Sequence, residues 1–220
     1  MKKIDWKLCL VADADLARGL DLLDKVVRSV QAGATLVQLR AKNLPTKEFL
    51  DLSLAIATKL SKVKVPLIIN DRLDVALAGQ AAGVHLGQDD MPLGYARTLL
   101  GHGRLIGISV ATVEEAHRAE HGGADYIGAG PVFATATKDC LRPPIGLDGL
   151  RRIREAVKLP LLAIGGINVH NAGDVVKAGA DGIAVVSAVM NAPDIGLATS
   201  ELLKAMSGQL SPGDGSIVRS

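Results

Sequence analysis

The sequence is poor in cysteine: only Cys9 and Cys140 occur among 220 residues, one in an apolar run and one in a predicted loop. Two such distant thiols build neither the disulfide framework of a small secreted domain nor a cysteine-based zinc site. We therefore interpret both as free thiols in a reducing compartment.

Long apolar runs are also missing. The first residues, Met-Lys-Lys-Ile-Asp-Trp, lack the apolar core of a signal peptide, and no later stretch is long enough and free enough of charge to cross a bilayer. We expect a soluble, cytoplasmic protein without a membrane partner.

Charge of one sign is not concentrated anywhere. The formal net charge is +2, and acidic and basic residues are spread along the chain without a basic stripe. This distribution argues against a nucleic-acid partner. Any bound anion should be small and held in a local pocket.

No Ser-His-Asp or Cys-His constellation can be assembled from the histidines. His85 lies inside a predicted strand and is interpreted as a satisfied core residue, and the others fall in or near predicted helices. The others are His102, His117, His121 and His170. Nucleophilic catalysis by a triad is therefore not expected.

Short runs rich in Val, Ile and Leu alternate with longer segments of helical periodicity, a pattern typical of βα units on a parallel sheet. The predicted strands are Lys7–Ala12, Thr35–Arg40, Pro66–Asp71, Val84–Gly87, Leu105–Val110, Asp125–Gly130, Pro160–Gly165 and Gly182–Ser187. The predicted helices are Leu16–Gln31, Thr46–Leu60, Met91–Leu100, Val113–His121, Leu147–Val157, Asn171–Lys177 and Pro193–Met206.

Eight such units favour a single-domain α/β protein, a closed TIM (β/α)₈ barrel. The rival is an open doubly wound sheet, but no glycine fingerprint of a dinucleotide site follows the first strand. We expect residues 1–206 to form the catalytic barrel and residues 207–220, which lack periodicity, to be a disordered tail.

Catalytic residues of such barrels lie at the carboxyl ends of the strands. At the end of the second strand, Gln38, Arg40 and Lys42 are spaced by two, which places them on one face. If this face points inward, the two cations require a bound anion or a matching carboxylate. The alternative is that the strand ends early and both cations are solvated.

Carboxylates follow the next two strands. Asp71 closes the third strand, and Asp90 follows the fourth. Converging oxygen ligands of this kind suit Mg²⁺, which needs one or two carboxylates besides water and phosphate. The alternative is that each aspartate only caps the helix after it.

The loop after the sixth strand runs from Gly130 through Lys138 and Cys140 to Pro144, and its length is typical of an active-site flap, with hydroxyls at Thr135 and Thr137 and a cation at Lys138. Gly165-Gly166 follows the seventh strand, where barrel loops commonly bind phosphate through backbone N–H groups. The residues therefore predict one metal-bound polyphosphate and a separate phosphate, an arrangement typical of group transfer from a diphosphate.

Several segments in the same order resemble the thiamine phosphate synthase family over the chain from the first strand to the last helix. They are Val37-Gln38-Leu39-Arg40-Ala41-Lys42, Ile69-Asn70-Asp71-Arg72, His85-Leu86-Gly87-Gln88-Asp89-Asp90, Gly130 through Lys138, and Ala163-Ile164-Gly165-Gly166-Ile167.

The resemblance implies an enzyme that joins a hydroxymethylpyrimidine diphosphate to a (carboxy)thiazole phosphate with loss of pyrophosphate. It implies that Mg²⁺ is bound by Asp71 and Asp90, and that Arg40, Lys42, Lys138 and Ser109 are catalytic. The implied pyrimidine diphosphate site is Gln38, Leu39, Arg40, Ala41, Lys42, Asn70, Ser109 and Lys138. The implied thiazole phosphate site is Thr135, Ala136, Thr137, Gly166, Val186 and Ser187.

Two positions depart from the family pattern. Ala41 stands where an acidic residue is usual, and Ala111 stands where a histidine often follows the serine by two positions. The second departure puts the contact around the fifth strand in doubt. Two other functions stay open: a thiazole tautomerase-like enzyme, and a non-catalytic barrel that binds a phosphorylated metabolite. The sequence leaves both a monomer and a homodimer open.

Overall fold

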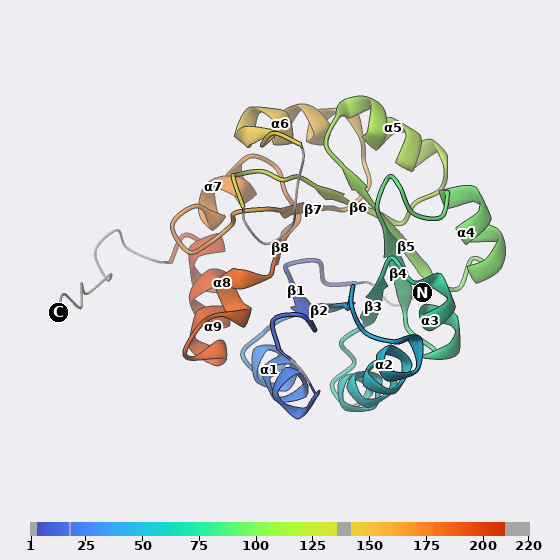
Figure 1. Ribbon diagram of the computed structural model, residues 1–220. Helices are drawn as coiled ribbons and strands as arrows, with labels where there is room; N and C mark the ends of the chain where they lie inside the picture. The colour runs from blue at the N-terminus through green and yellow to red at the C-terminus, as the bar shows by residue number, and fades with distance from the viewer. Residues whose placement is uncertain (1–3, 18, 136–141, 210–220) are drawn as a thin grey trace.

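The computed structural model describes residues 4–17, 19–135 and 142–209, which form a closed barrel of parallel strands. The strands pair in chain order, and β8 returns to β1, so the ring closes as predicted (Figure 1). They are β1 (Leu8–Asp13), β2 (Leu36–Arg40), β3 (Leu67–Asn70), β4 (Gly83–Leu86), β5 (Leu105–Val110), β6 (Tyr126–Ala129), β7 (Leu161–Ile164) and β8 (Gly182–Val185).

Helices form an outer ring around these strands (Figure 1). They are α1 (Gly19–Gln31), α2 (Thr46–Ser61), α3 (Leu73–Ala78), α4 (Leu93–Leu100), α5 (Val113–His121), α6 (Gly146–Ala156), α7 (Ala172–Lys177), α8 (Ser187–Met190) and α9 (Ile195–Met206). The short helices α3, of six residues, and α8, of four, were not predicted, whereas α7, also of six residues, was. Ser187, predicted as the end of the last strand, begins α8 instead.

The strands separate two apolar layers. Side chains such as Leu10 and Leu39 point outward and pack against the helices. The inner layer consists of Cys9, Val11, Leu36, Ile68, Leu105, Tyr126, Leu162 and Ala184. The Tyr126 ring packs on Trp6, with ring centroids 4.9 Å apart, and this pair fills the interior toward the amino ends of the strands. The open end is therefore the carboxyl end, as predicted.

Close approach of two backbones at the β1–β8 seam requires glycine at position 182. A Cβ atom there would lie 1.8 Å from the Trp6 carbonyl oxygen. We predict that Gly182→Ala lowers the free energy of unfolding by roughly 3 kcal/mol, since backbone must shift to make room. A Cβ atom at Gly94 in α4 would meet no other side chain or backbone within 4 Å, so Gly94→Ala should instead be neutral or stabilising. Urea denaturation of both variants checks the contrast; equal stability of the two would contradict it.

Of the helices in the part of the chain that the structure describes, none has the length and apolar character needed to traverse a membrane.

Candidate active site

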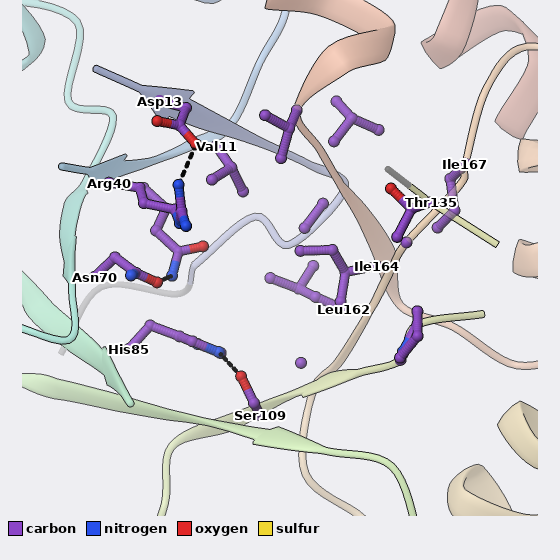
Figure 2. Close-up of a pocket in the computed structure, with 18 of the residues that line it drawn as sticks. Val11, Asp13, Arg40, Asn70, His85, Ser109, Thr135, Leu162, Ile164 and Ile167 are labelled. Atoms are coloured by element: carbon purple, nitrogen blue, oxygen red, sulfur yellow. Dashed lines mark hydrogen bonds and ion pairs between the residues drawn. The ribbon is translucent and has the colours of Figure 1, made fainter. Parts of the chain in front are cut away.

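A cavity of about 920 Å³ opens at the carboxyl ends of the strands. Most of the predicted site residues line it: Gln38, Arg40, Lys42, Asn70, Asp71, Ser109, Thr135, Gly166, Val186 and Ser187. Figure 2 shows that the two sides of the cavity carry different kinds of side chain. Asp13, Arg40, Asn70, His85 and Ser109 lie on one side, and Thr135 lies with apolar side chains of β7 and its loop on the other.

Arg40 is held by a buried carboxylate. Its Nη1 lies 2.5 Å from Oδ2 of Asp13, whose side chain is 3% exposed, and 3.9 Å from Asp15 (Figure 2). Asp13 and Arg40 are register partners on β1 and β2, so the pair follows from strand pairing. The guanidinium therefore faces the cavity in a fixed position and satisfies the requirement for a matching carboxylate.

Lys42 forms a second ion pair, with 2.5 Å between its Nζ and Oδ2 of Asp71. Asp71 follows β3 and has φ of +62°, a left-handed conformation that aspartate and asparagine adopt more readily than most residues. Its backbone N–H donates to the carbonyl of His85 on the neighbouring strand, at 2.8 Å. This bond fixes the unusual turn and aims the carboxylate at Lys42.

The Asp90 carboxyl lies beside that of Asp71, but Asp90, unlike Asp71, is not among the described residues that line the cavity. Its Oδ2 accepts a 2.6 Å hydrogen bond from the Gly87 N–H, which closes the turn after β4. Burial raises the pKa of Asp90, and hydrogen bonding to the neighbouring Asp71 carboxylate raises it further. Two carboxylates held this close favour a cation between them.

Amide and hydroxyl groups form the floor of the same side. Gln38 Nε2 donates to Asn70 Oδ1 at 3.1 Å across β2 and β3. His85 Nε2 lies 2.9 Å from Ser109 Oγ, and its Nδ1 lies 3.0 Å from the Tyr126 hydroxyl. Figure 2 shows the contact between His85 and Ser109 as a dashed line.

The opposite side is built on a glycine turn after β7. Gly165 and Gly166 both have positive φ, and a Cβ atom at Gly166 would lie 2.6 Å from the Ala134 carbonyl oxygen. The Phe133 N–H donates to the Gly165 carbonyl at 3.0 Å, which fixes the start of the loop after β6 against this turn. Thr135 is thereby placed at the cavity beside backbone that only glycine permits.

Some predicted residues are not brought into the cavity by their side chains. Leu39 is fully buried between barrel and helices, and Ala41 packs against the same layer, so only their backbone atoms could contact a ligand. Ala136, Thr137 and Lys138 lie outside the described residues, as does Cys140. Residues 210–220 of the predicted tail also lie outside them.

Several residues that line the cavity were not predicted, among them Asp13 and His85. Asp13 was not considered, although a carboxylate at the end of an apolar strand was a usable signal. His85 was interpreted as a core residue; it is 8% exposed and indeed hydrogen-bonded, but it also reaches the cavity. His85 on β4 is hydrogen-bonded to Ser109 on the neighbouring strand β5. The spacing of residues within one strand cannot predict such a contact between strands.

The segment Ser109-Val110-Ala111 at the end of β5 is hydrogen-bonded to the helix that follows it. The Ala111 N–H donates to Oε2 of Glu115 at 2.7 Å, and Oε1 of Glu115 lies 2.7 Å from Arg142 Nη1. Arg142 lines the cavity and comes from the far end of the loop after β6. The carboxylate of α5 therefore ties the end of β5 to that loop.

Known proteins resemble this chain over nearly its whole length. The sequence profile described as thiamine monophosphate synthase matches residues 8–189. The thiamine-phosphate synthase of Chloroflexus aurantiacus is 50% identical over 90% of this chain and 92% of its own length. The thiamine-phosphate synthase of Syntrophomonas wolfei is 49% identical over 89% of this chain and 93% of its own length.

A solved structure agrees with the sequence relatives. The thiamine phosphate pyrophosphorylase of Pyrococcus furiosus superposes with a TM-score of 0.85 at 43% identity, covering 94% of this chain and 98% of that one. From these matches it follows that the chain belongs to the thiamine monophosphate synthase family.

Proposed function

We infer that this chain is a transferase that makes thiamine phosphate in the cavity described above, from a hydroxymethylpyrimidine diphosphate and a (carboxy)thiazole phosphate. The observation that carries this inference is the division of one cavity into a charged side and a largely uncharged side with a glycine turn. A diphosphate and a monophosphate need different surroundings, and one cavity offers both.

The charged side suits the diphosphate. Arg40 and Lys42 lie on the same strand end, and each is paired with a carboxylate that fixes its direction. Arginine and lysine placed where negative charge develops stabilise a departing pyrophosphate without reorganising. We assign the diphosphate to Arg40, Lys42 and Lys138, and the pyrimidine to Gln38, Asn70 and Ser109, with backbone contacts from Leu39 and Ala41.

Asp71 and Asp90 fit a magnesium ion. Among the described residues no group of three or more potential ligand side chains occurs, but Mg²⁺ typically takes one or two carboxylates and completes its shell with water and phosphate. Burial, and next the hydrogen bond to Asp71, raise the pKa of Asp90, and a cation bound between the two carboxylates would favour their ionised forms. Bound Mg²⁺ would neutralise charge on the leaving pyrophosphate.

The largely uncharged side, which carries the glycine turn, suits the thiazole phosphate. Positive φ at Gly165 and Gly166 turns backbone toward the cavity, where N–H groups can donate to a phosphate without a side chain in between. We assign this half to Thr135, Ala136, Thr137, Gly166, Val186 and Ser187. The apolar side chains of Leu162, Ile164 and Ile167 line this half (Figure 2) and would then contact the thiazole ring.

The reaction is a substitution at the pyrimidine methylene carbon. The C–O bond to the diphosphate breaks, its electron pair leaves with pyrophosphate, and the thiazole nitrogen donates its lone pair to form the new C–N bond. A carboxythiazole then also loses CO₂. The chain's residues bind both halves, hold the leaving group's charge and keep the reacting atoms in line.

The deciding experiment incubates the purified protein with both phosphorylated halves and Mg²⁺ and measures thiamine phosphate and pyrophosphate in equal amounts. Omitting either half should abolish both products. Isomerised thiazole phosphate without coupling would favour the tautomerase alternative. Tight binding of either half with no turnover by folded protein would favour a non-catalytic metabolite-binding barrel, and both outcomes refute a synthase.

A further inference from the structure

A column of rings occupies the barrel interior beneath Ser109. Trp6 packs on Tyr126 with centroids 4.9 Å apart, and Tyr126 lies next to His85 with centroids 5.4 Å apart. Phenylalanine, tyrosine and tryptophan total only five in this chain, so two of them in one column is a concentration of a scarce residue type. The column ends at the cavity floor, where His85 meets Ser109.

Glycines on two strands make room for this column. A Cβ atom at Gly107 of β5 would lie 2.1 Å from the Tyr126 ring and 2.5 Å from His85 Nδ1. A Cβ atom at Gly128 of β6 would lie 2.9 Å from His85 Cε1. Any other residue at these inward positions would displace the imidazole. The strands are thus shaped around the Tyr126–His85 contact.

The direction of hydrogen bonding along the column follows from the phenol. Burial raises the pKa of Tyr126 well above its ordinary value, so the hydroxyl keeps its proton. Within residues 4–17, 19–135 and 142–209, its hydrogen-bond partner is His85 Nδ1, at 3.0 Å. A buried O–H needs an acceptor, so Tyr126 donates and Nδ1 must offer its lone pair.

The proton of a neutral imidazole then sits on the other nitrogen. His85 Nε2–H donates to Ser109 Oγ, 2.9 Å away, and the serine oxygen is an acceptor in that bond. The serine's own hydrogen is left to point elsewhere, and Ser109 lines the cavity. The hydroxyl therefore faces the ligand as a hydrogen-bond donor.

We propose, building on the function proposed above, that Tyr126 and His85 are positioning residues that fix Ser109 as a donor to a ring nitrogen of the aminopyrimidine. Ring nitrogens of that half accept hydrogen bonds, whereas its amino group donates them. With the opposite tautomer, Ser109 would donate to His85 and present only lone pairs to the ligand. The column thus selects the pyrimidine half by the sense of one hydrogen bond.

The test compares Tyr126→Phe, which removes the donor and keeps the ring, with Tyr95→Phe, whose tyrosine is 71% exposed on α4. We expect Tyr126→Phe to lower kcat/KM for the pyrimidine diphosphate roughly tenfold, the size of one hydrogen bond, with the thiazole phosphate KM unchanged. Tyr95→Phe should change neither. Equal behaviour of the two variants would overturn the assignment.

A spectroscopic measurement separates positioning from mere packing. In ¹⁵N-histidine-labelled protein, the His85 signal, identified by its loss in His85→Gln, should report a proton on Nε2 and should shift toward the Nδ1–H form in Tyr126→Phe. A wild-type proton on Nδ1 would refute the inference. This readout needs no turnover, so it stands apart from failure of the synthase assay.

A double variant supplies the last control. The amide nitrogen of glutamine takes the place of Nε2–H and needs no phenol to set its tautomer. His85→Gln should therefore keep part of the activity, and adding Tyr126→Phe to it should cause no further loss. A further tenfold loss in the double variant would mean that the Tyr126 hydroxyl acts otherwise than by setting the His85 tautomer, and would overturn its proposed role.

Discussion

Replacing Asp71 with asparagine is expected to lower kcat/KM by roughly 1,000-fold, about 4 kcal/mol of transition-state stabilisation, while the fold is kept. The carboxylate charge is lost at a proposed metal position, next to Asp90. Asparagine is chosen over alanine because Asp71 has φ of +62°, which asparagine tolerates and alanine does not. Steady-state kinetics over a range of Mg²⁺ concentrations measure the effect.

Two comparisons make the Asp71 result specific. Asp148→Asn, at a side chain 83% exposed on α6, should leave activity unchanged. Lys42→Met removes the ion-pair partner of Asp71 but not the carboxylate, so it should lower kcat without raising the Mg²⁺ concentration required. Asp71→Asn should raise that requirement. An Asp71→Asn enzyme as active as the original at saturating Mg²⁺ would contradict the assignment.

Removing the charge of Arg40 should damage both stability and catalysis. Arg40→Met leaves the Asp13 carboxylate, 3% exposed, without its cation, and breaking such a buried pair costs about 3 kcal/mol. The same change removes one of the proposed pyrophosphate contacts, for which we expect kcat to fall roughly 100-fold. Thermal unfolding and kinetics measure the two effects separately.

The double variant Arg40→Met with Asp13→Asn separates the two roles of the arginine. Neutralising Asp13 removes the unpaired buried charge, and the asparagine Oδ1 can still accept the Asp15 N–H, so stability should largely return. Activity should not return. Arg151→Met, which breaks an exposed pair with Asp148, should cost at most about 1 kcal/mol. Recovered activity in the double variant would make Arg40 structural rather than catalytic.

The sequence predicted the barrel well because its signals are local. Alternating apolar runs and helical periods mark βα units, and eight units imply closure, which the β1–β8 pairing confirms. The period of two also indicated correctly that Gln38 and Arg40 share the inward face. The misses are the short helices α3 and α8 and the end of β8, where Ser187 begins α8 instead of ending the strand.

Partners across strands were beyond the sequence. Arg40 could have been solvated or anion-bound; the register of β1 against β2 gives it Asp13. The left-handed turn at Asp71, its closeness to Lys42, and the raised pKa of Asp90 depend likewise on neighbouring strands. The fifth-strand segment gained a contact to Arg142 through Glu115, which nothing in the local pattern indicates.

The sequence by itself determined the number and order of units, the end of the barrel that carries polar residues, and the family resemblance, because all three are written in residues close together along the chain. Only the tertiary structure decided which charged side chains form ion pairs. It alone also showed that His85 is hydrogen-bonded to Ser109 at the cavity. Such contacts join β4 to β5 and β6, and their geometry exists only when the barrel is closed.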